Sequence, residues 1–423
     1  MTINVLPSLD KSLMRAINRY RVLYTIRNRN LISRADISRT TGLSPASVTN
    51  ITAQLIEEGL LLEKEPGDSM GGRRPILLAL NPDGAFTLGV YLSAQHISAV
   101  IINLQADILA KFSMPFEEKD TSPASIAETI VQAVHQCMWS SELSKNAISG
   151  VGVAVPGSVD SFTGLIRFLP NYQWEDVNLK EILYQKLQIP TYIDNNANSL
   201  TLTEQWFGRG QDVDNLIVVN LAQGVGIGIV VNGQLYMGHS GIAGEFGHTT
   251  IDPAGPVCRC GKRGCLEAYV GNYAILKNAI ALARKGAWKC DNLEHLTIEG
   301  VVTRAFAGES ALIDLYANTG RILGIGIANL IEIFNPEKII ISGKGTNAGK
   351  LIFDTMYKTL PEQLSGNVEE RAEVIVQEWK DTDTARGAGV LVLREIYKFP
   401  LGQGSPSSDE QPSTGSQTKY AEA

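Results

Sequence analysis

Four side chains with the chemistry of metal ligands lie close together in the chain. Cys258, Cys260 and Cys265 fall within eight residues, and His248 precedes the first of them by ten. Three thiolates and one imidazole form the ligand set of a closed, tetrahedral structural zinc site. The other interpretation is three unrelated buried thiols beside a surface histidine, which such close spacing makes the weaker one. The sequence therefore predicts one structural zinc ion per chain, in a loop spanning 248–265.

Two glutamates flank this loop without being needed as metal ligands. Glu245 lies three residues before His248, and Glu267 lies two residues after Cys265. Their carboxylates are free to accept hydrogen bonds from a polar ligand held beside a metal-stiffened loop. The alternative is that both are solvated at the surface, as isolated glutamates usually are.

Composition limits the classes of protein to which the chain can belong. Its 423 residues are 44% hydrophobic, which is enough for two or three domains with cores of their own. The amino terminus has no basic, apolar signal segment, and no apolar run reaches the roughly 18 residues of a membrane span. Cysteines are few and mostly in the metal loop, which fits a reducing compartment. We expect a cytoplasmic protein without membrane insertion.

Charge is distributed unevenly along the chain. The net charge of the whole chain is -7, whereas residues 1–80 hold 11 Lys and Arg against 7 Asp and Glu. A basic head on an acidic body is typical of a protein with a nucleic-acid-binding arm.

The basic head has helices at helix-turn-helix spacing. Apolar positions predict one helix over 11–29, and Ser33, a suitable N-cap, predicts a second helix that ends at Thr41. A third opens at Ser44-Pro45, a hydroxyl cap followed by a proline at the first helical position. In this motif the N-terminal end of the third helix enters the major groove. The candidate base-contacting residues at that end are Ser44, Ser47, Thr49 and Asn50.

A β-hairpin is predicted after the third helix. Residues 60–64 and 75–80 have the pattern of two strands, joined by a polar tip that holds Arg73 and Arg74. Guanidinium groups at the tip of such a wing can contact phosphate or the minor groove. The alternative is a three-helix interaction domain with solvated arginines. Residues 1–80 are thus predicted to form a winged helix-turn-helix domain, mainly α-helical, that binds DNA.

From about residue 86 onward, short apolar strands alternate with long helices. The segment 88–155 has the pattern of three strands, a helix and a buried strand, and the segment 215–398 repeats this plan. The repeat predicts two α/β lobes with a cleft between them. We expect this domain to span 85–400. The residues 401–423, rich in Ser, Gly, Gln and Pro, are expected to form a disordered tail.

Together these motifs resemble the ROK family of repressors and sugar kinases, of which the xylose-operon and N-acetylglucosamine repressors are typical members. The resemblance covers about residues 11–398 and implies an actin-like, ribonuclease-H-like fold for the two lobes, a hexose pocket in the cleft, and homodimers or tetramers. The motifs that carry it, besides the winged helix, are Arg15-x-x-Asn18, Gly224-x-Gly226-x-Gly228, and Glu245-x-x-His248 with Cys258-x-Cys260-x4-Cys265-x-Glu267.

The chain departs from the family's kinases at their phosphate-binding turns. Those kinases carry an Asp and a Gly-Gly-Thr turn for ATP phosphates, where this chain has Tyr91 and Ser93-Ala94-Gln95. Their second turn, Gly-Thr-Gly, is Ala222-Gln223-Gly224 here. Lys344 stands among the glycines that bind the nucleotide in the family. Without these glycines, the backbone cannot approach a phosphate group as closely as it does in the kinases.

A further departure concerns the catalytic base. The family's proton-accepting Asp is replaced by Asn196, and an amide cannot act as a general base near neutral pH. Asp194 lies two residues earlier and is the one candidate for a substitute base. We therefore predict no catalytic residues and no enzyme activity.

The sugar-contacting residues of the family are retained. Asn196 can still hydrogen-bond a hydroxyl, and His248 offers a second ring nitrogen beside the one that binds zinc. Pro156-Gly157 and Asn171 are expected to line the opposite lobe. The resemblance assigns sugar contacts to Asn195, Asn196, Glu245, His248 and Glu267.

Retained sugar contacts without catalytic groups are typical of a sensor. The sequence thus predicts a sugar-responsive, DNA-binding transcriptional regulator, a repressor of carbohydrate uptake or catabolism genes. Its expected partners are operator DNA, a sugar effector and further copies of the chain. Two alternatives stay open: an active ROK sugar kinase with an appended DNA-binding domain, and a repressor controlled by a protein partner such as a sugar-transport component.

Overall fold

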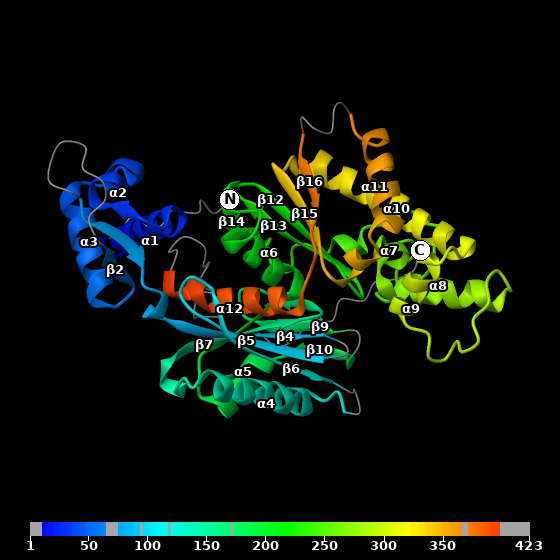
Figure 1. The fold of residues 1–423 in the computed structure, drawn as a ribbon, viewed down its shortest axis with the longest axis horizontal. Helices are drawn as coiled ribbons and strands as arrows, with labels where there is room; N and C mark the ends of the chain where they lie inside the picture. Colours follow the sequence, from blue (N-terminus) through cyan, green and yellow to red (C-terminus); the bar gives the residue numbers. More distant parts are fainter. Residues whose placement is uncertain are drawn as a thin grey trace, which may run out of the picture.

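The computed structural model describes residues 11–64, 75–93, 96–116, 120–169, 172–365 and 371–397. An N-terminal group of helices with a small sheet is followed by two α/β lobes (Figure 1). Among these residues, no helix combines the length and the apolar character needed to span a bilayer.

The N-terminal part contains three helices whose limits follow from local sequence signals. α1 spans Lys11–Arg29, α2 spans Arg34–Thr41 and α3 spans Pro45–Glu57. The hydroxyls of Ser33 and Ser44 accept backbone N–H bonds at the start of α2 and α3, as the sequence predicted. Gly42 ends α2 with a φ of 66°, a left-handed conformation that suits glycine.

A three-stranded sheet completes this part. β2 (Leu61–Lys64) and β3 (Leu77–Leu80) form an antiparallel pair, as predicted for the hairpin. β1 (Ile32–Ser33), which the sequence did not indicate, pairs with β3 on its other side. The predicted hairpin tip, with Arg73 and Arg74, lies outside the described residues.

The first lobe is built on a five-stranded mixed sheet in the order β11-β7-β4-β5-β6. β4, β5 and β6 are antiparallel neighbours, and β7 and β11 run parallel to β4. This lobe also contains a small antiparallel sheet, β8-β9-β10, and the helices α4 and α5. Of these, the sequence predicted only α4. The bounds are β4 Phe86–Leu92, β5 His96–Ile102, β6 Ile108–Pro115, α4 Pro123–Ser141, β7 Ile148–Val155, β8 Ser158–Asp160, β9 Leu165–Leu169, β10 Trp174–Val177, α5 Leu179–Leu187 and β11 Thr191–Asn195.

The second lobe repeats this plan with the strand order β14-β13-β12-β15-β16. The predicted strands and the helices α10, α11 and α12 are present, whereas the short helices α7, α8 and α9 were not anticipated. The bounds are α6 Asn196–Phe207, β12 Leu216–Leu221, β13 Val225–Val231, β14 Gln234–Leu235, α7 Glu267–Val270, α8 Asn272–Arg284, α9 Ile298–Phe306, α10 Ser310–Phe334, β15 Lys338–Ser342, α11 Lys350–Glu362, β16 Glu373–Val376 and α12 Asp381–Tyr397.

Two helices, α6 and α12, lie between the two large sheets (Figure 1). α12 packs on β4 and β7 at distances that exclude side chains. A Cβ atom on Gly89 would lie 1.9 Å from the Ala385 carbonyl oxygen, and one on Gly152 would lie 1.8 Å from that of Ala388. Each lobe has a core of its own, and a third apolar cluster joins α1 and α3 to α12 and the C-terminal end of α6. The N-terminal part therefore packs directly on the lobes.

Candidate metal centre and ligand cleft

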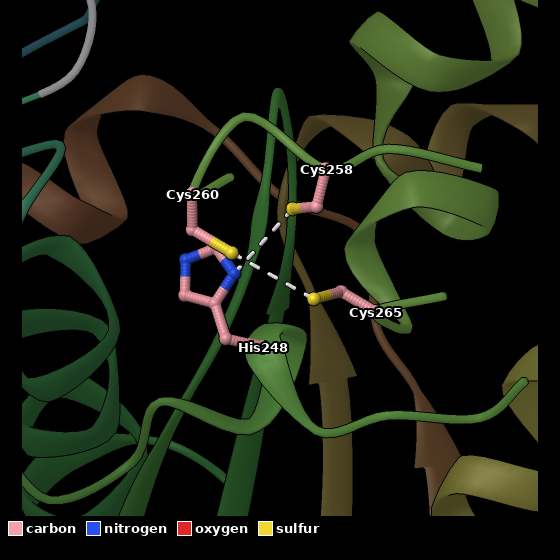
Figure 2. A group of neighbouring side chains, drawn as sticks. All are labelled: His248, Cys258, Cys260 and Cys265. Carbon is pink, nitrogen blue, oxygen red and sulfur yellow. Dashed lines mark hydrogen bonds between the residues drawn. The ribbon is translucent and has the colours of Figure 1, made fainter. Parts of the chain in front are cut away.

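The four predicted metal ligands converge on one point. Their ligand atoms all lie within 4.8 Å of one another. Figure 2 shows His248 and the three cysteines facing a common centre, with Nδ1 of His248 3.6 Å from Sγ of Cys258 and Sγ of Cys260 3.7 Å from Sγ of Cys265. Such a group can hold a metal ion in tetrahedral coordination.

Glycines and short backbone bridges fold the loop that carries the cysteines. Gly261 and Gly264 have φ values of 86° and 68°, which other residues rarely adopt. A Cβ atom on Gly264 would also lie 1.5 Å from the carbonyl oxygen of Asp252. The Cys258 N–H donates to the Lys262 carbonyl at 2.8 Å and closes the turn. Burial and the neighbouring thiols raise the pKa of Cys265 to about 12.

His248 presents its two ring nitrogens to different partners. Nδ1 faces the sulfurs, whereas Nε2 lies 3.9 Å from a carboxylate oxygen of Glu245. The Glu245 side chain is 45% exposed. Burial nevertheless raises the pKa of Glu245, against the opposing effect of His248 and a hydrogen bond from Ser158 of the first lobe. The histidine thus joins the metal centre to a carboxylate that faces the other lobe.

Glu267, the first residue of α7, is buried and not solvated, with 5% of its surface exposed. One carboxylate oxygen accepts the Val225 N–H at 3.0 Å. The other accepts the Arg259 guanidinium at 3.0 Å. Sequence reasoning did not single out Arg259, although its position between two metal ligands could have drawn attention to it.

The start of α6 carries the remaining candidate sugar contacts, Asn195 and Asn196. Asn195 caps the helix by accepting the Asn198 N–H at 2.8 Å. Asn196 is 9% exposed, and its Oδ1 atom has no hydrogen-bond partner among the described residues. A buried acceptor without a donor is costly, so this amide oxygen is available to a hydroxyl of a ligand.

Asp194 does not have the environment of a substitute base. One of its oxygens accepts bonds from the Ser161 hydroxyl at 2.8 Å, the Asn198 amide at 2.9 Å and the Asn195 N–H at 2.7 Å. The residue is 3% exposed, and burial raises its pKa despite these bonds. Asn196 is moreover the first residue of α6, whereas Asp194 belongs to β11, so the two residues do not lie in one extended segment. Asp194 serves to hold the start of α6.

The first residues of β13 bring these groups into one neighbourhood. Val225 contacts Glu267 through its N–H, and the next residue, Gly226, approaches Ala197 so closely that a Cβ would lie 3.2 Å from the Ala197 Cβ. From the first lobe, the Ser161 N–H donates to the Gly241 carbonyl of the second lobe at 3.0 Å. Pro156-Gly157 follows β7 in this first lobe, and the predicted lining residue Asn171 lies outside the described residues.

Comparison with known proteins decides the family. The model of the ROK family matches residues 87–395. The chain belongs to the ROK family. A xylose repressor of Caldicellulosiruptor bescii is 32% identical over 402 residues, covering 92% of this chain and 99% of the relative.

Solved ROK structures confirm the actin-like α/β fold. A ROK family transcriptional regulator, a homologue of the E. coli MLC protein, superposes with a TM-score of 0.77 at 28% identity, over 91% of this chain and 97% of that one. A ROK family glucokinase from Streptomyces griseus, in complex with glucose and AMPPNP, gives a TM-score of 0.64 at 26% identity, over 73% of this chain and 99% of that one.

The residues at the end of β4 and the start of β5, at the position compared above with the first phosphate turn of the kinases, belong to an aromatic and ionic cluster. Tyr91 is buried, and its ring centroid lies 5.9 Å from those of His96 and Trp379. His96 Nε2 lies 2.6 Å from a carboxylate oxygen of Asp381, at the start of α12. Side chains from β4, from β5 and from the start of α12 therefore lie together beside this turn. Ala94 and Gln95 lie outside the described residues.

Lys344 forms an ion pair with a neighbouring helix. Its ammonium lies 2.8 Å from a carboxylate oxygen of Glu299 on α9. The ion pair partly neutralises that charge.

The candidate DNA contacts at the start of α3 divide into two kinds. Ser44 accepts the Ser47 N–H at 3.2 Å, and their hydroxyls lie 2.9 Å apart. Thr49 donates to the Pro45 carbonyl at 2.8 Å. Asn50 is exposed, and the described residues offer its side chain no hydrogen bond. Ser44 and Ser47 thus have a capping role, while Asn50 is free to reach a partner.

A cavity of about 740 Å³ lies between the N-terminal part and the lobes. Its lining includes Arg27 and Lys64 on one side and Gln105, Asp107, Trp206 and Phe207 on the other. Since the predicted sugar contacts are not among its lining residues, we do not assign it to the effector.

Proposed function

We propose that the chain is a sugar-responsive transcriptional repressor in which a kinase-like ROK body serves as the sensor. The observation that carries this proposal is Asn196, an amide at the position of the kinases' proton-accepting Asp, with a buried oxygen left unpaired. The amide keeps a hydrogen bond to a sugar hydroxyl and cannot remove its proton. Two relatives that match along nearly the whole chain, one named a xylose repressor and the other a transcriptional regulator, support the same conclusion.

The N-terminal part is the DNA-binding unit, a winged helix-turn-helix that we assign to residues 1–80. α2 and α3 form the helix pair, and β2 and β3 form the base of the wing. α3 enters the major groove with Asn50, whose amide can pair with adenine, and Thr49 beside it. Arg73 and Arg74 of the wing contact phosphate or the minor groove.

The metal centre holds one structural zinc ion. Zinc bonds of about 2.3 Å to sulfur and about 2.0 Å to nitrogen, at tetrahedral angles, separate two sulfurs by about 3.8 Å and a sulfur from a nitrogen by about 3.5 Å. The separations of 3.7 Å and 3.6 Å fit that geometry. With four protein ligands the site is closed, so the metal stabilises the loop and takes no part in chemistry.

The sugar lies in the cleft, which we assign to the domain 85–400. The carboxylates of Glu245 and Glu267, the amides of Asn195 and Asn196, and Nε2 of His248 provide acceptors and donors for adjacent hydroxyls. Glu245 already faces Ser158 of the first lobe. A sugar held from both lobes favours a closed arrangement of the cleft.

Release of DNA follows from that closure. The chain acts as a homodimer or tetramer that presents two winged helices to half-sites about one helical turn apart. Closing the lobes changes the spacing of the two winged helices, so that they no longer match the operator. Genes for carbohydrate uptake or catabolism are then expressed.

Two assays on the purified full-length protein test this function against the kinase alternative. Calorimetric titration with a panel of pentoses, hexoses and acetamido sugars is expected to show one sugar that binds. A coupled assay for ADP release with the same panel and Mg-ATP is expected to stay at background. Sugar-dependent ADP release would show a working kinase with an appended DNA-binding domain.

A further inference from the structure

Arg259 stands between two of the candidate zinc ligands and reaches across to the sugar site. It follows Cys258 and precedes Cys260 in the loop of Figure 2. Its Nη2 and Nε atoms lie 3.0 Å and 3.3 Å from the same oxygen of Glu267. The Arg259 side chain is 29% exposed and that of Glu267 is 7% exposed, so this ion pair is largely withdrawn from water.

A second contact fixes the guanidinium. Its central carbon lies 4.0 Å from the centroid of the Tyr273 ring, close enough for a cation–π interaction. The Tyr273 hydroxyl in turn lies 3.8 Å from Sγ of Cys258. The chain of contacts from Cys258 through Arg259 and Tyr273 thus returns to Cys258, and Glu267 is attached to it.

The neighbouring backbone restricts the position of the Glu267 carboxylate. A Cβ atom on Gly224 would lie 2.2 Å from the Glu267 carboxylate and 3.0 Å from Nη2 of Arg259, so the turn between β12 and β13 closes one side. The Val225 N–H holds the oxygen that Arg259 does not. Each oxygen therefore has a donor of its own.

We propose that Arg259 is the positioning residue of the sugar site: it neutralises Glu267 and fixes the orientation in which that carboxylate accepts sugar hydroxyls. This inference rests on the proposed function. A buried carboxylate without a partner is costly, so Glu267 depends on this cation. With a metal ion bound, its ligands Cys258 and Cys260 on either side would hold the backbone of Arg259 and so fix its position against Glu267.

Lysine does not replace Arg259 in this role. The guanidinium is planar, donates from two nitrogens to one oxygen, and stacks on a ring, whereas an ammonium is a compact charge on a flexible stem. The substitution Arg259→Lys therefore separates charge from geometry. Arg263 provides a matched control, since it lies in the same loop and, among the described residues, its side chain hydrogen-bonds only the Gly255 carbonyl.

The test compares wild type, R259A, R259K and R263A as zinc-loaded full-length proteins. The dissociation constant of the bound sugar is expected to rise at least tenfold in R259A and R259K and to stay within twofold in R263A. In a protein that already carries Glu267→Gln, adding R259A should change the dissociation constant of the sugar by less than threefold, because the two residues act as one unit. The zinc content and the DNA affinity of R259A, R259K and R263A should match those of wild type.

Hydrogen exchange provides a readout that needs no sugar. The backbone amide of Val225 should exchange faster in R259A than in wild type and R263A, since Glu267 no longer holds it. Unchanged exchange, or equal sugar binding in R259A and R263A, overturns the inference. Failure of wild type to bind any sugar in the panel instead overturns the proposed function and the sugar role of Arg259 with it.

Discussion

The guanidinium of Arg27 lies over the ring of Trp206, with 4.0 Å between its central carbon and the ring centroid. Arg27 is in the last turn of α1, in the N-terminal part, and Trp206 is in the last turn of α6. α6 has 12 residues, a length of about 18 Å, and begins at Asn196. One helix therefore joins the candidate sugar site to the part that we assign to DNA binding.

We expect this contact to transmit the sugar signal. Arg27→Met keeps the apolar stem and removes the charge, which is worth about 1–2 kcal/mol when it is desolvated against a ring. The variant should bind operator and sugar within threefold of wild type, while the sugar-induced loss of DNA affinity falls about tenfold. Both constants and their coupling are measured by DNA-binding titrations with and without sugar.

Arg29→Met is the control, because Arg29 is exposed at the end of the same helix. Its coupling should equal that of wild type. A normal response of Arg27→Met to sugar would show that the signal takes another route.

Loss of one thiolate should empty the metal centre. Cys260→Ser replaces sulfur with an oxygen that binds zinc poorly, so the metal content should fall well below one ion per chain and the Tm by about 5 °C or more. Inductively coupled plasma mass spectrometry and thermal unfolding measure the two effects. Cys290→Ser changes a cysteine outside the cluster and should lower neither the metal content nor the Tm. Full zinc occupancy in Cys260→Ser would contradict the ligand assignment.

Ser44 and Asn50 should have separable effects, although both lie at the start of α3. Ser44→Ala removes the cap and should lower the free energy of unfolding by about 1 kcal/mol. Asn50→Ala should leave unfolding unchanged and weaken operator binding by about 1–3 kcal/mol. Denaturant titrations and DNA binding on matched and mutated operators distinguish the two. Equal losses of stability in Ser44→Ala and Asn50→Ala would indicate that Asn50 acts on folding, and would contradict its assignment to the DNA interface.

The buried Asp194 predicts a pH dependence of stability. Burial raises its pKa in the folded state, opposed by its hydrogen bonds and by Arg394, so the folded protein binds a proton more readily than the unfolded chain. The stability of wild type relative to Asp194→Asn should therefore rise as the pH falls through the raised folded pKa, and level off below the unfolded value of about 3.9. Urea titrations of both proteins between pH 8 and about pH 4 measure this difference. A difference that is flat or falls with decreasing pH would contradict the assignment.

The features predicted best from sequence are those set by neighbours in the chain. The caps at Ser33 and Ser44 depend on a few adjacent residues, and both are as predicted. The four candidate metal ligands could be recognised because three of them share one loop. The strands β8, β9 and β10 were missed because pairing with one another, and not periodicity, decides them.

Long-range partners account for the rest. The role of Arg259 depends on Glu267, which the fold brings to it, and the ion pair of Lys344 depends on Glu299, 45 residues away in sequence. Similarly, Asp194 looked free to act as a base until Ser161 and Asn198 were found to occupy it. Residue type predicted which groups could do chemistry, and only the fold showed which of them are already engaged.

The most direct measurement is fluorescence anisotropy of the full-length protein on the intergenic DNA upstream of its own gene, at fixed salt, titrated with the sugar panel. We expect sequence-selective binding that one sugar releases, and no release by that sugar in Glu267→Ala at unchanged DNA affinity. Tight, selective binding that no sugar disturbs would contradict the sensor and point to control by a protein partner.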